Sequence, residues 1–115
     1  MINFACQRFQ LEQIIRCGLA LTKTDYKILN FLVENTEDWL TTEDIAEKFN
    51  INVSTAQRAV KKLHLEKVLQ RTQNNLDNGG YIFLYKSYSK DYVKKMILEI
   101  VAKWTKAIEQ ELEIW

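Results

Sequence analysis

The segment from Lys90 to Trp115 contains neither proline nor glycine, the residues that most often end a helix. Apolar side chains recur in it every three or four residues, as on one face of an α-helix. A helix of about 25 residues is roughly 37 Å long, more than so small a domain can cover. The stripe consists of Val93, Ile97, Ile100, Trp104, Ala107, Ile108 and Leu112.

Four shorter helices are predicted before this segment, from apolar residues at helical spacing and from capping residues. The first covers residues 7–18 and ends at a glycine. The next two begin at Thr22 and at the pair Thr41–Thr42. Ser54 and Gln57 have the S-x-x-Q spacing of a capping box, so the fourth helix is predicted to begin near Ser54. Its core-facing residues would be Ala56, Val60 and Leu63.

The segments VLQRT and GYIFLYK predict a β-hairpin, because the sequence QNNLDNG between them is rich in turn-forming residues. Trp39 and Leu40 offer one short additional strand. Every residue from Tyr81 to Tyr85 is apolar or aromatic. A strand with one face in water would alternate, so we expect both faces to be covered, one of them by the C-terminal helix.

Charge is distributed unevenly, although the net charge is only +1. Residues 34–47 include acidic residues and no lysine or arginine, whereas residues 54–72 are basic with Glu66 as the one acid. A near-neutral protein with a local basic segment binds polyanions at that segment. The basic residues are Arg58, Lys61, Lys62, Lys67 and Arg71.

The sequence LTTEDIAEKFNINVSTAQRAVKKLHLEKVLQR resembles the winged helix-turn-helix, in which a capped helix, a turn and a recognition helix precede a strand. With its flanks, the resemblance covers residues 19–115 and is strongest to short TrmB-like and MarR-like regulators common in archaea. It implies one mainly α domain over residues 1–115 with a small β-hairpin wing. Helices at 7–18 and 89–115 would flank a winged-helix core at 22–88. Relatives usually have glycine where this chain has Lys67.

Members of these groups are typically homodimeric transcription factors that bind double-stranded DNA. The resemblance therefore implies a recognition helix at about 54–64 in the major groove and a wing at about 72–81 on the adjacent backbone or minor groove. Polar side chains suit base edges, whereas lysines and hydroxyls suit phosphates. The predicted DNA contacts are Thr42, Ser54, Thr55, Gln57, Arg58, Lys61, Lys62, Arg71, Asn74, Asn75 and Asn78. A winged-helix adaptor that binds protein instead of DNA is the alternative.

The apolar stripe of the last helix has two interpretations. It packs only on its own domain, or it pairs with a second subunit, which we favour because of its length. The predicted dimer contacts are Phe9, Ile14, Ile97, Ile100, Trp104, Ile108 and Leu112.

Other signals indicate no catalytic chemistry. Cys6 and Cys17 lack the spacing of a zinc or redox motif, and we expect both to be reduced and partly buried. His64 is the single histidine, and we expect it to be exposed. No nucleophile–base pair or phosphate-binding loop is visible, so we expect no enzyme, metal or cofactor. No apolar run reaches membrane-spanning length and the first residues do not resemble a signal peptide, so a cytoplasmic protein is expected.

Overall fold

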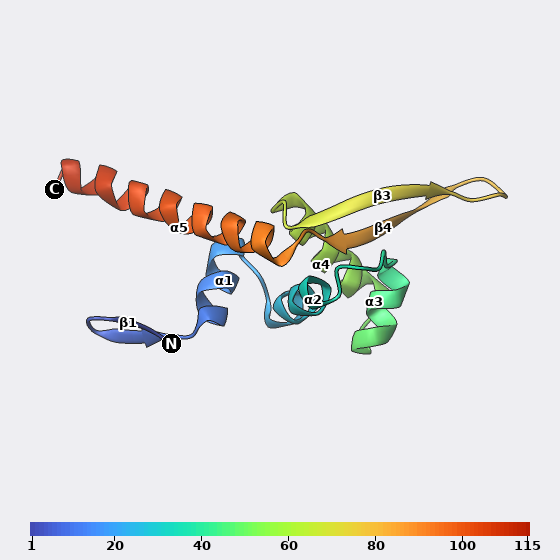
Figure 1. The fold of residues 1–115 in the computed structure, drawn as a ribbon, viewed down its shortest axis with the longest axis horizontal. Coiled ribbons are helices and arrows are strands. Elements are labelled where there is room, and N and C mark those ends of the chain that lie inside the picture. Colours follow the sequence, from blue (N-terminus) through green and yellow to red (C-terminus); the bar gives the residue numbers. More distant parts are fainter.

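The computed structural model describes residues 1–115 and is mainly α-helical, with two separate antiparallel β-hairpins (Figure 1). The molecule is elongated, measuring 61 × 26 × 25 Å. This architecture confirms the predicted fold class. The elements are β1 (Ile2–Phe4), β2 (Gln7–Phe9), α1 (Leu11–Leu19), α2 (Lys23–Glu34), α3 (Thr42–Phe49), α4 (Val53–Leu65), β3 (Leu69–Asn75), β4 (Tyr81–Ser87) and α5 (Lys90–Glu113).

The core lies where α2, α3 and α4 pack together below the base of the β3–β4 hairpin. The predicted core residues Ala56, Val60 and Leu63 of α4 are fully buried, and so is Ala59, which the predicted stripe omits. Ala59 is buried because α4 packs against both α2 and α3, which covers a wider stripe than one neighbouring helix would. The opposite side of α4 is left free.

The predicted starts of α2 and α3 are correct. Thr22 with Asp25, and Thr41 with Asp44, form capping boxes in which each side chain accepts a backbone N–H of the other residue. The predicted start of α4 near Ser54 is correct to within one residue, because that helix begins at Val53. The capping box predicted there is wrong, since the N-cap is Asn52, which makes no side-chain hydrogen bond. The turn before it closes with Asn50 in the left-handed conformation, so the chain enters the helix before it reaches Ser54.

The predicted N-terminal helix over residues 7–18 is also wrong at both ends. Residues Gln7–Phe9 form β2, which pairs with β1, and α1 continues to Leu19, where Ala20 closes it with φ of 56°. Gly18 therefore lies inside α1 and does not end it. A Cβ atom at Gly18 would be 3.2 Å from Cγ2 of Ile100, so the glycine allows α1 and α5 to approach closely.

The β3–β4 hairpin projects from the body on the side opposite to α5 (Figure 1). Strand β3 is longer than predicted and the loop is correspondingly shorter, because Asn75 still pairs with Tyr81, whereas β4 has the predicted length and is shifted by one residue. The expectation that α5 covers the second face of β4 is wrong: Tyr81 is 55% exposed and Ile82 36%. The predicted strand at Trp39 and Leu40 is reduced to a single bridge between Leu40 and Tyr85.

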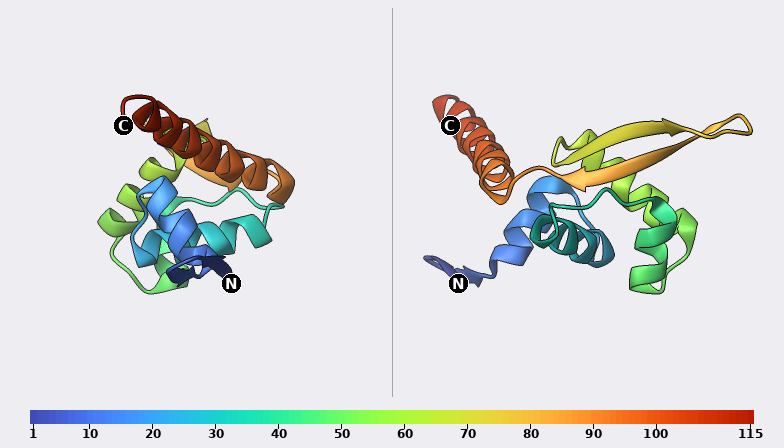
Figure 2. Two further views of the ribbon diagram at one scale, coloured as in Figure 1. Left: turned by 90° about the vertical axis from the view of Figure 1, so that its left-hand side faces the viewer. Right: turned by 45° about the vertical axis from the view of Figure 1, so that its right-hand side comes forward.

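Helix α5 begins where the predicted helix 89–115 does, and the hydroxyl of Ser89 at its N-cap accepts the N–H of Tyr92. Its first half packs on the domain through buried Val93 and half-buried Ile97 and Ile100. From Val101 onward every residue is exposed, and the helix extends beyond the body (Figure 2). No helix of the structure is both long enough and apolar enough to cross a membrane.

Lys67 connects α4 to β3 with φ of 65°, the left-handed conformation that favours glycine. Lys67→Gly is therefore expected to raise the free energy of unfolding by about 1 kcal/mol, because the Cβ strain disappears. Denaturant unfolding measures this change. Lys61→Gly, in the interior of α4, is the control and should destabilise the protein by about 1 kcal/mol. A destabilised Lys67→Gly variant would contradict the expectation.

Candidate nucleic-acid interface

The solvent-exposed side of α4 presents a continuous polar surface. Ser54, Gln57, Arg58 and Lys61 are exposed and Thr55 is half-buried; we call these five residues the reading face. Arg58 donates a hydrogen bond from Nη2 to Oγ1 of Thr55 at 3.3 Å, which holds the guanidinium along the helix. Neither Arg58 nor Lys61 takes part in an ion pair of the structure. The reading face thus carries two cations without internal partners.

Helix α4 lacks a side-chain cap, so the first backbone N–H groups of the helix have no side-chain acceptor. These donors lie beside Ser54, at the positive end of the helix dipole, where anions bind favourably. The N-terminus of α3 is less suited to an anion, although Thr42 is a predicted contact there. The hydroxyl of Thr42 donates to the carboxylate of Glu43 at 3.2 Å.

Lys62 does not belong to the reading face, although it follows Lys61 directly. Its Nζ atom lies 3.0 Å from the carbonyl oxygen of Ala20 and 3.2 Å from Oδ2 of Asp25. One residue along a helix turns the side chain by about 100°, which suffices to direct Lys62 toward α2. The two neighbouring lysines therefore have different partners.

The register of the β3–β4 hairpin separates the predicted wing residues. Arg71 and Asn75 lie on one face of the hairpin with Phe83 and Tyr81, whereas Asn74 lies on the other face. Asn78 is in the loop. The sequence prediction treated the asparagines as one group because it placed all three in a loop.

Two aromatic residues of this first face were not predicted as part of the site. The guanidinium of Arg71 lies 4.2 Å from the ring centre of Phe83, and the rings of Phe83 and Tyr81 meet edge to face. This stacking holds the Arg71 guanidinium against the face of the β3–β4 hairpin. Cross-strand pairing within GYIFLYK could have revealed this group if the register had been known.

His64 is half-buried near the end of α4, which corrects the expectation that it is exposed. Burial lowers the pKa of His64 below its ordinary value, and the positive charge of Arg71 lowers it further. His64 therefore binds a proton more tightly in the unfolded chain than in the folded protein. The stability that the neutral imidazole contributes is present above about pH 6.5 and is lost as pH falls through the lowered pKa.

His64→Gln is expected to remove this loss, because glutamine does not titrate. The wild-type melting temperature should fall more than that of the variant between pH 7.5 and pH 5, and thermal unfolding monitored by circular dichroism measures both. Equal decreases in the two proteins would contradict the lowered pKa.

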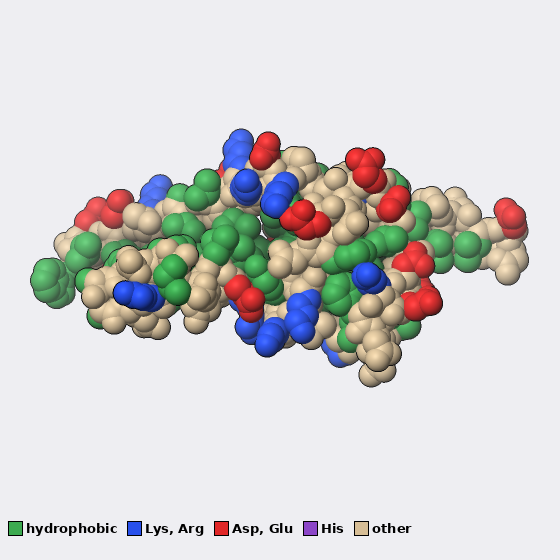
Figure 3. Space-filling view, turned by 60° about the horizontal axis from the view of Figure 1, so that its bottom comes forward, with side chains coloured by type: hydrophobic (Ala, Val, Ile, Leu, Met, Phe, Trp, Pro, Cys, Tyr) green, Lys and Arg blue, Asp and Glu red, His purple; other side chains and the backbone are tan.

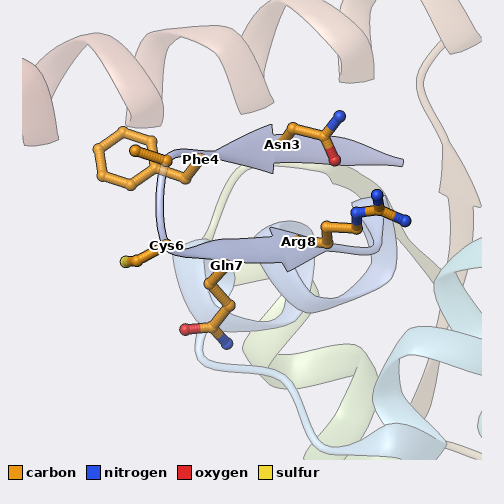
Figure 4. A pocket seen from close by; sticks show the side chains of 6 residues that line it. Asn3, Phe4, Cys6, Gln7 and Arg8 are labelled. Atoms are coloured by element: carbon orange, nitrogen blue, oxygen red, sulfur yellow. The ribbon is translucent and has the colours of Figure 1, made fainter.

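The hollows beside the β1–β2 hairpin and on the outer half of α5 are both open to solvent. The hollow beside the β1–β2 hairpin is lined by that hairpin alone, and its side chains point in different directions (Figure 4). Cys6 and Cys17 are free and exposed, which corrects the expectation of partial burial. No three histidine, cysteine or acidic side chains come together in a way that could hold a metal ion.

The helix-turn-helix with its projecting hairpin defines a winged-helix protein, and comparison with solved structures agrees. A MarR family protein from Bacillus stearothermophilus matches with a TM-score of 0.51 at 19% identity, over 90% of this chain and 68% of that one. The Staphylococcus aureus MepR–DNA complex matches with a TM-score of 0.52 at 17% identity, over 89% of this chain and 74% of MepR.

A protein described as a "possible transcriptional regulator" from Methanosarcina mazei is much more similar. It is 43% identical, with a TM-score of 0.91 over all of this chain and 96% of that one. Residues 9–108 match the model of the DnaD N-terminal domain. The chain belongs to the DnaD N-terminal domain family.

Proposed function

We propose that this protein is a transcriptional regulator that binds specific double-stranded DNA as a homodimer. The observation that carries the proposal is the reading face of α4, where two unpaired cations stand among short hydrogen-bonding side chains, beside a projecting hairpin. The similarity to a protein described as a possible regulator supports it at the level of function. The MepR–DNA complex shows that another chain with this fold binds DNA.

Helix α4 would lie in the major groove with the reading face toward the bases. Thr55 and Gln57 can donate to and accept from base edges, and Arg58 can bind O6 and N7 of a guanine through two hydrogen bonds. Lys61 lies about one turn further along the helix, where it would meet a phosphate. Ser54 and the free N–H groups of the first turn would bind another phosphate.

The wing would contact the DNA next to this groove. Arg71 and Asn75 share the face that also carries Tyr81, so they can contact one backbone or minor groove together. Asn74, on the opposite face, would be the weakest of the predicted wing contacts. Asn78 would contact DNA from the loop.

The apolar second half of α5 supports a homodimer. Trp104 is 62% exposed and Leu112 57%, and with Ile108 they line an open apolar surface on the outer half of α5. Exposed apolar side chains are visible at several places on the face of the molecule drawn in Figure 3. Ile97 and Ile100 are already half-buried on the domain, so the outer residues would contribute most of the interface. Phe9 and Ile14, both half-buried, would border it. Two subunits would present two reading faces to half-sites about 34 Å apart.

The salt dependence of binding to a random-sequence duplex distinguishes this function from that of a protein-binding adaptor. Each phosphate contact that releases a counterion makes the slope of log K against log salt more negative by about 0.9. We expect a slope of several units for this protein. An adaptor would bind the duplex weakly and with little dependence on salt. Selection of bound sequences from a random pool then identifies the specific site.

A further inference from the structure

Lys62 joins three separate parts of the chain. Its ammonium group donates to the carbonyl of Ala20, at the end of α1, and to the carboxylate of Asp25, in the first turn of α2. Asp25 is only 6% exposed, and its Oδ2 atom also accepts the backbone N–H of Thr22 at 3.0 Å. The contact thus fixes α4 to the junction between α1 and α2.

Loss of the Lys62 ammonium group would leave both of its acceptors without this donor. The carbonyl of Ala20 lies at a helix end, where backbone acceptors lack partners inside the helix. A buried carboxylate that loses its cation is costly, because its charge has been removed from water. A phosphate contact by Lys62 would have to replace both interactions, whereas Lys61 is free to make one.

The α1–α2 junction is in turn connected to α5. Helix α1 packs against α5, with Gly18 next to the side chain of Ile100. Lys62 therefore connects α4, through α1, to α5, which carries the proposed dimer surface. Lys62 adds a polar contact to the apolar packing of α4 on α2 and α3, at the end of α2 that adjoins α1.

We propose that Lys62 is a positioning residue, which sets the orientation of α4 relative to the α1–α2 junction and does not itself bind DNA. This role rests on the proposed function. The two adjacent lysines of the basic segment then have different roles. Lys61 provides a positive charge for a phosphate contact, and Lys62 orients α4 through its ion pair with buried Asp25.

The test compares Lys62→Met, Asp25→Asn and the double variant with Lys61→Met as the matched control, on a duplex obtained by selection. Asparagine can still accept the Thr22 N–H, so the cap of α2 is kept. We expect Lys62→Met and Asp25→Asn each to weaken binding about tenfold with an unchanged salt slope. The double variant should be no weaker than either single one. Lys61→Met should instead lower the slope by about one unit.

Asp25→Asn separates positioning from simple electrostatics. It removes a negative charge, which by itself would favour binding to DNA, whereas loss of positioning weakens binding. The role is overturned if Lys62→Met lowers the salt slope by about one unit while Asp25→Asn binds as tightly as the wild type or more tightly. Failure of the wild type to bind any duplex is a different result, which overturns the proposed function and this role with it.

Thermal unfolding of each variant shows whether it is folded at the assay temperature. If Lys62→Met unfolds because Asp25 is left unpaired, the double variant carries the test, since it contains neither charge. Weakened binding of the folded double variant with the wild-type slope supports the role. Wild-type affinity of that variant overturns it.

Discussion

Arg58→Ala is expected to weaken binding to the selected duplex by about 1–3 kcal/mol and to relax the base preference at one position. The guanidinium is exposed on the reading face and pairs with no acid, so its loss should leave the fold intact. Fluorescence anisotropy with the selected duplex and with single-base variants of it measures affinity and preference together.

Lys61→Ala is the comparison for Arg58→Ala, because it removes a positive charge one turn away on the same face. It should weaken binding to all sequences equally and lower the salt slope by about one unit. If Arg58→Ala alters neither affinity nor base preference, α4 does not read the DNA in the proposed orientation.

Ile108→Glu is expected to convert the protein into a monomer and to lower its affinity for a two-half-site duplex by about 10²–10⁴-fold. Ile108 is 40% exposed in the second half of α5, where no residue is buried. The substitution should therefore leave the monomer folded while placing a charge in the apolar interface. Analytical ultracentrifugation measures the assembly, and a binding titration measures the affinity.

Gln110→Glu provides the control, since it adds the same charge two residues away, outside the apolar stripe. It should remain dimeric and bind DNA with little change. A dimeric Ile108→Glu variant would place the interface elsewhere, and a monomeric variant with wild-type affinity would separate DNA binding from assembly.

Local patterns predicted the helices well where the signal lies within a few residues. The helix starts at Thr22 and Thr41 and the core positions of α4 are correct because each depends on residues close together in the sequence, whereas the capping box predicted at Ser54 does not form. Gly18 shows the limit of such reasoning. Its role depends on Ile100, a residue far away in the sequence, so a local rule for helix ends assigned it wrongly.

The candidate site was predicted as a set of residues but not as an arrangement. Exposure of Gln57, Arg58 and Lys61 follows from helical periodicity, and the structure agrees. The partner of Lys62 is in another helix, and the face on which Asn75 lies depends on the register of the hairpin. Neither can be deduced from spacing along one segment.

The most direct test of two subunits reading one duplex is the mass of the complex in solution. Light scattering coupled to size exclusion, applied to the intact protein alone and with the selected duplex, should give two chains for the free protein and two chains on one duplex. A single chain at concentrations well above tens of micromolar, or one chain on each duplex, would contradict the proposed regulator.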